Sequence, residues 1–273
     1  MGATITHHEP HGTRQEQSSW PTVRHVPVSE PFRWLALGLR DLKRTPGASL
    51  MYGLLFVFAG YAMLGFASME PRLVLTFVTS FLLIGTFLSI GFYELSHRLE
   101  DGKTAHLGHA LSAWRHNPVT LAAFALVLGL TVGIWFRASA LIVGMFFGSV
   151  ELAINGWGSF MQALLNGQQG LAFVTTFMAT GALLAIFAFS ISVVSIPMIN
   201  ARQVDVVTAI VTSIRAVKRN PAAMAVWAGL IALLIGAGMA TLMIGLLFTL
   251  PLIGHASWHA YRRIVEDENL PAA

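Results

Sequence analysis

Cysteine is absent from this chain of 273 residues. Without thiols the protein forms no disulfide, no thiolate nucleophile, no iron–sulfur cluster and no C-x-x-C-H haem attachment. Charge is scarce, because Asp, Glu, Lys and Arg together supply only 11% of the residues. Recognisable catalytic patterns are missing too, since no Ser stands in a G-x-S-x-G frame and no Gly-rich turn ends in Lys-Ser or Lys-Thr. We therefore expect a protein that is not an enzyme.

Apolar residues dominate what is present. They make up 55% of the chain, and the mean hydropathy of +0.66 exceeds what a soluble core of this size explains. A helix crosses the roughly 30 Å of bilayer hydrocarbon with about 20 apolar residues. Runs of about that length with little or no charge lie at 50–68, 73–93, 118–136, 171–196, 221–237 and 241–259. The sequence therefore predicts six membrane spans, and the stretch 118–148 fits either one long helix or a span plus an interfacial segment.

The two ends of the chain are polar. Residues 1–30 include HHEPH and RQEQSS and lack the apolar core of a secretory signal, so we expect a disordered cytoplasmic tail there. We expect a second, short tail at 266–273. The membrane domain is predicted to occupy 31–265.

The distribution of Lys and Arg predicts the orientation. Fifteen of the 17 lie before the first predicted span, in the second and fourth connections, or after the last span: Arg14, Arg24, Arg33, Arg40, Lys43, Arg44, Arg98, Lys103, Arg115, Arg202, Arg215, Lys218, Arg219, Arg262 and Arg263. Arg72 and Arg137 fall in the first and third connections. The positive-inside rule then places both termini on the cytoplasmic side of a bacterial inner membrane. The basic balance is explained by topology and anionic headgroups, and we expect no nucleic-acid partner.

Three basic turns precede a proline in the same way. The stretches LKRTPGASLMYG, AWRHNPVTLAAF and AVKRNPAAMAVW set cations and a Thr or Asn before Pro46, Pro118 and Pro221. Before each turn, apolar residues three and four apart predict one face of an amphipathic helix. The aligned sets are Leu35, Leu39 and Leu42; Leu107, Leu111 and Trp114; and Ile210, Ile214 and Val217. In the second span of each pair, Ser89-Ile90-Gly91, Ser195-Ile196-Pro197 and Thr249-Leu250-Pro251 also align.

The predicted fold class is all-α: a polytopic membrane protein whose six transmembrane helices form three helical hairpins, each preceded by a cytoplasmic interfacial amphipathic helix. The internal repeats are predicted at about 31–98, 103–202 and 206–263. In each turn, Thr or Asn is predicted to cap the first span and Pro to take its first position, where no amide is left unpaired. The turns also supply residues predicted to contact lipid or a partner: Lys43, Arg44, Arg115, His116, Lys218 and Arg219.

Histidine gives the main chemical hypothesis. In GHASWHAYRR, His255 and His259 lie one helical turn apart on one face. Two His at that spacing can ligate a metal or pair with a His of another helix around haem. The alternative is an imidazole and aromatic belt at the membrane interface, and the expectation for cofactors is none, with His255 and His259 as the candidate exception.

The stretches LPLIGHASWHAYRR, LGLRDLKRTPGASLMYG and RAVKRNPAAMAVW give the chain a family resemblance. It resembles uncharacterised proteobacterial integral membrane proteins with six spans, from about Val23 to Val265, most specifically at Gly254 to Arg262. Some members carry the label of cytochrome c oxidase subunits, so the resemblance implies membership of a respiratory assembly. A catalytic oxidase subunit is excluded because the chain lacks the several intramembrane His that hold haems and copper.

Two functions follow from these observations. The first is a non-catalytic accessory or assembly subunit of a bacterial inner-membrane complex with other integral subunits, for which a respiratory terminal oxidase is the candidate complex. The alternative is a small-solute transporter or channel. It requires a polar cavity near mid-membrane, for which the candidate lining residues are Thr79, Ser80, Thr86, Thr175, Thr176 and Thr180.

Single engineered cysteines test the predicted topology in a chain that has no native cysteine. We expect cysteines placed in 100–115 and in 205–218 to react with a membrane-impermeant thiol reagent from the same side, because both stretches belong to basic connections. Labelling of the two stretches from opposite sides of the membrane would contradict the three-hairpin arrangement.

Overall fold

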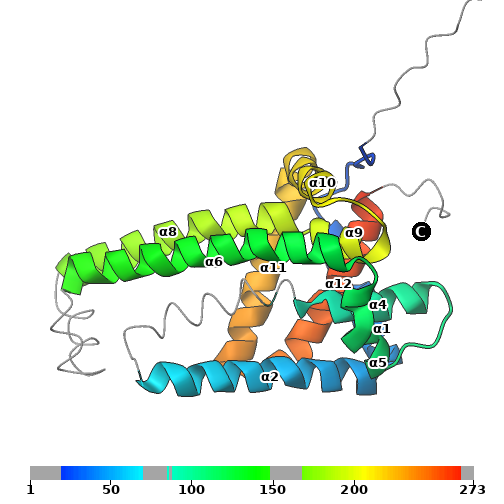
Figure 1. Ribbon diagram of the computed structural model, residues 1–273, viewed down its shortest axis with the longest axis horizontal. Coiled ribbons are helices and arrows are strands. Elements are labelled where there is room, and N and C mark those ends of the chain that lie inside the picture. Colours follow the sequence, from blue (N-terminus) through cyan, green and yellow to red (C-terminus); the bar gives the residue numbers. More distant parts are fainter. Residues whose placement is uncertain (1–19, 70–84, 86–87, 148–167, 266–273) are drawn as a thin grey trace, which may run out of the picture.

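The computed structural model describes residues 20–69, 85, 88–147 and 168–265, and these residues are predominantly helical (Figure 1). The helices are α1 (Glu30–Arg44), α2 (Pro46–Met69), α4 (Ile90–Glu100), α5 (Leu107–Ser112), η2 (Ala113–Arg115), α6 (Pro118–Phe147), α8 (Gln168–Ser192), α9 (Ser195–Ala201), α10 (Val206–Arg219), α11 (Pro221–Ala240) and α12 (Leu246–Ile264). The predicted all-α class is confirmed for this part of the chain.

The three repeats begin as predicted. The amphipathic helices α1, α5 with η2, and α10 each end at a basic turn, and the next helix starts at Pro46, Pro118 or Pro221. Proline suits the first helical position because its fixed φ is helical and it has no amide to leave unpaired. The turns therefore separate two helices in each repeat.

The amphipathic helices bury small residues at equivalent positions, and their apolar faces are only partly buried. Gly38, Ala110 and Ser213, which occupy equivalent positions in the three repeats, are all buried. The predicted apolar face stays partly open, with Leu39 41% and Leu111 49% exposed. Small buried residues let a neighbouring backbone approach closely, while Leu39 and Leu111 remain available to lipid, as the interfacial interpretation requires.

Four helical segments in the described part of the chain are long and apolar enough to cross a membrane: Pro46–Met63, Pro118–Phe147, Gly170–Ala201 and Pro221–Ala240. They coincide with the first, third, fourth and fifth predicted spans. Most of the second predicted span, 73–93, lies outside the described residues. The sixth predicted span corresponds to α12, which is not among the four.

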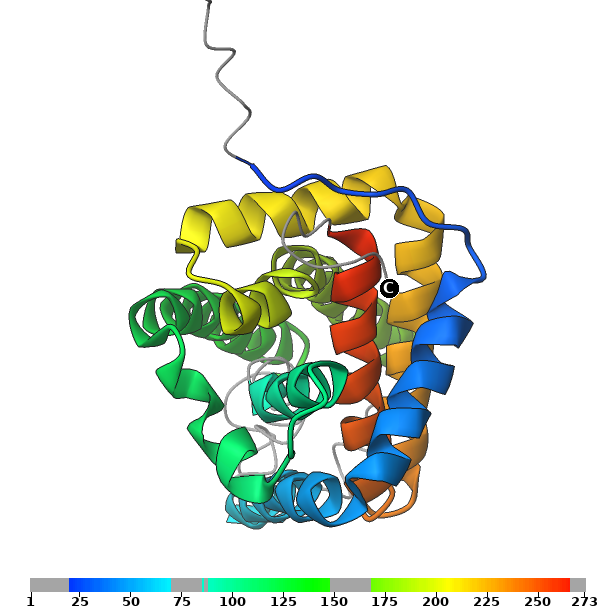
Figure 2. The same ribbon diagram turned by 90° about the vertical axis from the view of Figure 1, so that its right-hand side faces the viewer.

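The third hairpin is oriented differently from the second. The axes of α2, α6 and α8 are roughly aligned, with α8 antiparallel to the other two, whereas α11 and α12 run across these axes (Figures 1 and 2). The predicted set of three hairpins is therefore not confirmed, since most of the second predicted span lies outside the described residues and α11 and α12 cross the other long helices.

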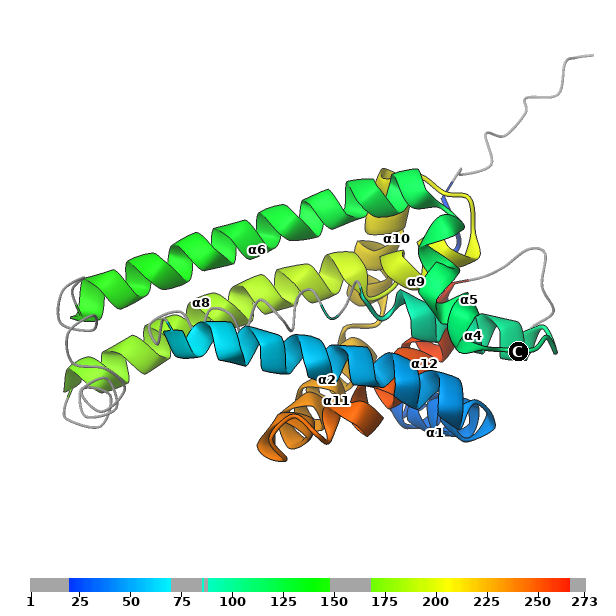
Figure 3. The same cartoon turned by 60° about the horizontal axis from the view of Figure 1, so that its bottom comes forward.

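The first helix of the second hairpin is a single long helix. α6 contains 30 residues, which corresponds to about 45 Å at 1.5 Å per residue. This settles the alternatives for 118–148 in favour of one helix, up to its described end at Phe147. Figure 3 shows α6 and α8 extending together beyond the end of α2. At their far end, Trp135, Phe173 and Phe177 form a buried apolar cluster with Ile142.

The amphipathic helices surround α4, α9 and α12. These three belong to the second span of each predicted pair, and we call them the returning helices. Figure 2 shows α1, α5 and α10 around α4, α9 and α12. We call this end of the molecule the polar end. α1 packs on α12, α5 on α4, and α10 on α9. Helices α5 and α10 thus contact the returning helix of the preceding repeat. Helix α1, which has no preceding repeat, contacts the returning helix of the third repeat.

Two asparagines at the repeated turns join the repeats together. The amide of Asn220 accepts from Val26 N at 2.8 Å and donates to Arg24 O at 2.9 Å. Asn117 donates to Val204 O at 3.0 Å. The predicted capping role is wrong for Asn220, whose side chain makes no cap hydrogen bond. The amide instead holds the segment that leads into another repeat's amphipathic helix.

The Asn220 contact also fixes the segment before α1. The prediction placed residues 1–30 in a tail, but Val26 is buried, Arg24 N donates to Ile264 O at 2.7 Å, and Val23 forms an antiparallel bridge with Val265. Residues 1–19 and 266–273 lie outside the described residues. The segment from Trp20 to Ser29 is therefore attached to the third repeat.

Substituting Asn220 by Ala tests this attachment. We expect the variant to lose about 1–3 kcal/mol of stability, since it leaves Val26 N without its buried acceptor. Amide hydrogen exchange should rise at Val26 and Arg24.

Asn117→Ala is the matched control. It should raise exchange at 202–204 and leave Val26 protected, because its partners precede α10. Equal protection of Val26 in the Asn220 variant and the unmodified protein would contradict the assigned role.

Candidate functional site

A buried carboxylate joins three helices at the polar end. Asp41 of α1 is 2% exposed, and its Oδ2 accepts hydrogen bonds from Ser96 Oγ of α4 at 2.8 Å and from His259 Nε2 of α12 at 2.7 Å. A buried ionised group is tolerated when it is paired and hydrogen-bonded, and both conditions are met here.

His255 extends this set of contacts toward α2. Its Nδ1 lies 2.7 Å from Ser96 Oγ, and its Nε2 lies 2.9 Å from Ser49 Oγ. Because the single Ser96 proton is donated to Asp41, Ser96 accepts from His255 Nδ1–H, and Nε2 then accepts from Ser49. The contacts therefore select one neutral tautomer of His255. We call Asp41, Ser49, Ser96, His255 and His259 the α1–α12 network.

The charge state of Asp41 follows from its surroundings. Burial raises the pKa of the Asp41 carboxyl, but the hydrogen bond and charge of His259, with the Ser96 hydrogen bond, outweigh burial and place the pKa below its ordinary value of 3.8. Asp41 is thus an anion at neutral pH, and it orients the side chains of α4 and α12 that meet it.

The other two repeats serve as an internal comparison for this network. Aligning the prolines places Ala113 and Ala216 at the position of Asp41, and both are buried. Leu121 and Met224 take the position of Ser49 and are also buried. Apolar residues therefore fill the same positions at the equivalent interfaces, so the fold does not require a polar network there. Of the three equivalent interfaces, the one between α1 and α12 carries this polar network at these positions.

The network residues other than the two histidines were not identified from the sequence. The available signal was Asp41 itself, an acidic residue aligned with alanine in the two other repeats. Ser49 and Ser96 carry no comparable signal, because an isolated Ser in an apolar helix commonly bonds its own backbone.

The predicted metal ligands are both committed to hydrogen bonds. Both ring nitrogens of His255 bond serines, and His259 Nε2 bonds Asp41. Among the described residues, no group of three or more His, Cys, Asp or Glu is arranged to hold a metal ion. The metal or haem hypothesis stays a prediction, and the contacts give the histidines a hydrogen-bonding role. With His255, Ser49 and Ser96 at 0% exposure, no substrate can reach either serine in this structure.

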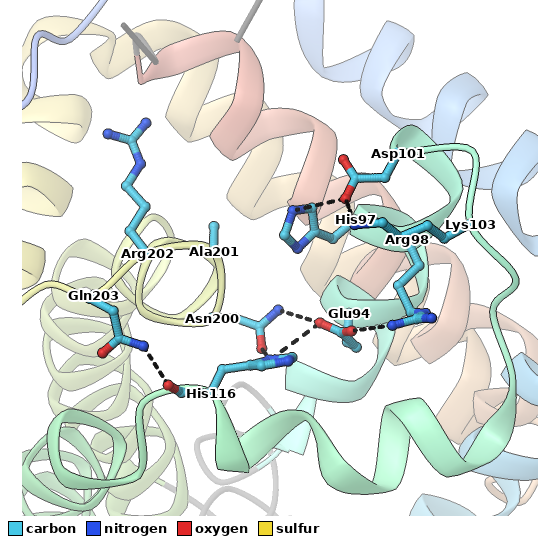
Figure 4. Close-up of a pocket in the computed structure, with 10 residues that line it drawn as sticks. All are labelled: Glu94, His97, Arg98, Asp101, Lys103, His116, Asn200, Ala201, Arg202 and Gln203. Atoms are coloured by element: carbon cyan, nitrogen blue, oxygen red, sulfur yellow. Dashed lines mark hydrogen bonds and ion pairs between the residues drawn. The ribbon is translucent and has the colours of Figure 1, made fainter. Parts of the chain in front are cut away.

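A polar pocket lies on the other side of α4. It has a volume of about 240 Å³ and is lined by Glu94, His97, Arg98, Asp101, Lys103, His116, Asn200, Ala201, Arg202 and Gln203 (Figure 4). These residues come from α4 and the loop after it, the turn before α6, and α9 with the segment that follows. The pocket thus forms where the first and second repeats meet. We call it the polar pocket.

Glu94 is the buried carboxylate of this pocket. It is 4% exposed, and its oxygens lie 3.4 Å from His116 Nδ1, 3.4 Å from Asn200 Nδ2 and 3.7 Å from Arg98 Nη1. All three distances exceed the usual range for a charge-assisted hydrogen bond. Glu94 therefore positions these side chains electrostatically rather than by short hydrogen bonds.

The pocket and the network share α4, and pocket residues also contact α12. Ser96 belongs to the network and His97 to the pocket, and the His97 ring stacks on Trp258 with 4.8 Å between ring centroids. Trp258 Nε1 in turn donates to Glu100 Oε2 at 2.9 Å. A change in the spacing of α4 and α12 therefore affects both sites.

The six predicted contact residues of the basic turns are exposed: Lys43, Arg44, Arg115, His116, Lys218 and Arg219. His116 differs from the others because it lines the pocket and approaches Glu94. Contact of these residues with lipid or a partner stays a prediction that their exposure supports.

The predicted transport pathway gains no support from the described residues. Thr79, Ser80 and Thr86 lie outside them. Thr175 is exposed, and its hydroxyl donates to the carbonyls of its own helix at Leu171 and Ala172. Thr176 is also exposed, Thr180 is half-buried, and none of the three lines the polar pocket.

Comparison with known proteins identifies a membrane protein. A family model described as predicted integral membrane protein (DUF2189) matches residues 73–200. That region includes the pocket residues from Glu94 to Asn200. No curated protein and no solved structure is significantly similar to the chain. With its four candidate spans, the chain is an integral membrane protein.

Acid titration tests the role of Asp41. Its lowered pKa means that the carboxylate stabilises the folded state above 3.8 and that this contribution is lost as the pH falls through the lower folded-state value. We expect Asp41→Asn to be less stable than the unmodified protein by about 1–3 kcal/mol near pH 6. Thermal unfolding in detergent should show the difference shrinking below pH 3.8.

Asp205→Asn is the control, because Asp205 also has a lowered pKa but is exposed and caps α10 through Val207 N and Thr208 N. Because Asn caps a helix about as well as Asp, this variant should change the stability little and leave the contact between α1 and α12 unchanged. A difference for Asp41→Asn that stays constant down to about pH 2 would show that the carboxylate charge is not involved.

Proposed function

We propose that the protein is a non-catalytic accessory or assembly subunit of a larger bacterial inner-membrane complex. The observation that carries this proposal is the apolar surface of the long helices. On α6, Leu126, Leu130 and Ile134 form one stripe and are 59–65% exposed. Lipid or the helices of another subunit can cover such a stripe. Because α6 and α8 extend beyond α2, the stripe is accessible to either of them.

The scarcity of charge inside the spans supports the same proposal. Within the described residues of the four candidate spans, Arg137 is the one Lys, Arg, Asp or Glu. Ionisable groups at membrane depth mark ion and substrate pathways in transporters and pumps. The buried ionisable groups Asp41 and Glu94 instead lie at the polar end, where they hold helices together.

The respiratory terminal oxidase remains the candidate complex, on the resemblance of Gly254 to Arg262 and the flanking stretches to proteins carrying that label. An accessory subunit needs no cofactor of its own. The positive-inside rule places the polar end, with its exposed basic turns, at the cytoplasmic surface of such a complex.

Purification from native membranes tests the proposal. We expect the tagged full-length chain, extracted in mild detergent, to recover other integral membrane subunits at fixed stoichiometry. A monodisperse protein without partners in the same extract would refute it.

Substitution of the α6 stripe sharpens this test. Replacing Leu126, Leu130 and Ile134 together by Ala should reduce partner recovery about tenfold or more if α6 is the contact, since each truncated interface side chain costs roughly 1 kcal/mol. The matched control replaces Met51, Leu55 and Phe58, the exposed stripe of α2. Equal effects of the two triple variants would indicate a loss of fold rather than of contact.

A further inference from the structure

The turn between α11 and α12 differs from an ordinary connection between two membrane spans. Residues 220–261 contain no Lys, Arg, Asp or Glu. Trp and Tyr, which anchor spans at the membrane surfaces, are absent from 228–257. By contrast, the connections that follow α2 and α6 contain charged residues, among them Arg72 and Glu151. The accessory function does not explain a connection without these anchors.

The exposed surface of the turn is apolar. Leu242 is 76% exposed, Ile244 57% and Phe248 54%. Tyr61 of α2, whose hydroxyl donates to Leu242 O, is also exposed, as is Phe58 one helical turn earlier. The apolar surface of the turn is therefore continuous with that of α2, which is a candidate membrane span.

The backbone of the turn is hydrogen-bonded within the protein. Every amide from Met243 to Thr249 donates to an acceptor of the chain. The carbonyls of 241–245 all accept a hydrogen bond, and the donor to Leu242 O is the hydroxyl of Tyr61. Non-helical backbone is tolerated in hydrocarbon only where the protein satisfies its polar groups, because no water is there to do so. The turn meets this requirement over these residues.

The conformation of the turn is unusual and is held by its neighbours. Leu242 and Met243 have φ values of 54° and 65°, in the left-handed region that residues with a Cβ rarely adopt. Such a conformation persists only when the surrounding structure determines it. Tyr61 bonds the Leu242 carbonyl, and the Met243 side chain is buried in one cluster with Phe56 and Leu246. The outward position of Leu242 is therefore a defined feature of the turn.

The contact with Tyr61 gives the depth of the turn. The candidate spans α2, α6 and α8 have roughly aligned axes, so the membrane normal follows them (Figure 1). Tyr61 follows Pro46 by 15 residues, which is about 22 Å along α2. Helix α2 continues to Met69, about 12 Å further, and α6 and α8 extend farther still (Figure 3). Because the hydrocarbon is roughly 30 Å thick, the turn lies inside it.

The length of α11 is compatible with this depth. Its 20 residues correspond to about 30 Å, which would cross the hydrocarbon if α11 followed the membrane normal. It runs instead across the axes of α2, α6 and α8 (Figure 1). Most of its length is therefore not depth.

We propose that α11 and α12 form a re-entrant hairpin whose turn lies in the hydrocarbon of the bilayer. Leu242, Ile244 and Phe248 contact lipid acyl chains there. Helix α11 then enters the membrane from the polar end and α12 returns to it. The third repeat contributes no loop to the opposite membrane surface, in place of the fifth and sixth spans predicted from the sequence.

Spin labels on single cysteines test this placement, since the chain has no native cysteine. Full-length Leu242→Cys and Ile244→Cys are labelled with a nitroxide and reconstituted in liposomes of phosphatidylcholine and phosphatidylglycerol. The two variants report on the turn independently if one of them does not fold. Molecular oxygen concentrates in hydrocarbon, whereas the polar complex nickel ethylenediaminediacetate stays in water. We expect the ratio of oxygen to nickel collision rates to be about tenfold higher in the turn than at an aqueous position, because polar groups are excluded from hydrocarbon.

Two control positions calibrate this ratio. Phe58→Cys reports on the exposed face of α2 in lipid, and Thr104→Cys on the exposed loop after α4 at the polar end. Agreement of the turn positions with Phe58 supports the re-entrant hairpin. Agreement with Thr104 would overturn it, because the turn would then reach water. Low collision rates with both reagents would overturn it too, because a second copy of the chain would then cover the turn.

Tyr61→Phe tests the hydrogen bond that satisfies the turn. The substitution removes the donor to the Leu242 carbonyl, and hydrocarbon offers no water to replace it. We expect a narrower spectrum from the label at Ile244, because the turn becomes more mobile. Tyr52→Phe is the matched control, since it removes a bond from another tyrosine of α2 to the Leu88 carbonyl, and it should leave the spectrum unchanged.

An unchanged spectrum in Tyr61→Phe would mean that water satisfies the Leu242 carbonyl, which contradicts a turn in hydrocarbon. None of these outcomes bears on copurification with a partner complex. Failure of the re-entrant hairpin is therefore distinguishable from failure of the accessory function.

Discussion

The Asp41 carboxylate is the contact on which the arrangement of the polar end depends. It lies within hydrogen-bonding distance of α4 through Ser96 and of α12 through His259. One turn earlier on α1, Gly38 allows close approach, since a Cβ there would lie 2.6 Å from Ala256 N. A buried anion must keep its donors, so helices that could otherwise slide along an apolar surface are held in one register.

This contact also explains why the three repeats are not equivalent. Alanine at the position of Asp41 in the other repeats leaves that position without a charge, and the turns of these repeats use Asn117 and Asn220 to hold neighbouring segments. In the first repeat the corresponding residue is Thr45, whose hydroxyl bonds Asp41 O and lies 3.1 Å from Ser49 Oγ. The turn of the first repeat thus contacts the α1–α12 network, whereas the turns of the other two repeats contact the segments that lead into α10 and α1.

The apolar surface and the charged groups lie in different parts of the molecule. The long helices expose leucine, isoleucine and methionine, which suit lipid or the helices of another subunit, and carry almost no charge in their described parts. The polar end gathers the buried carboxylates, the histidines and the pocket. Because α4 carries both Ser96 and His97, the polar pocket lies next to the contact that holds α1 on α12. The pocket and the helix register are therefore physically connected.

The sequence by itself determined the local features of this protein. Apolar periodicity and the fixed φ of proline act over a few residues, so α1, α5 and α10, the helix starts at Pro46, Pro118 and Pro221, and most of the apolar runs could be predicted. The exposure of the basic turns also followed, because charged side chains avoid an apolar interior.

The tertiary structure decided which distant groups meet. Asn220 has the residues of a helix cap in its sequence context, yet its amide bonds Val26, 194 residues away along the chain. His255 and His259 suggested a metal, but their partners Ser49, Ser96 and Asp41 come from three other helices. The crossing of α11 and α12 over the other long helices is likewise set by packing. Local patterns fix which face of a helix is buried, whereas the hydrogen-bond partner on that face depends on which helix arrives there.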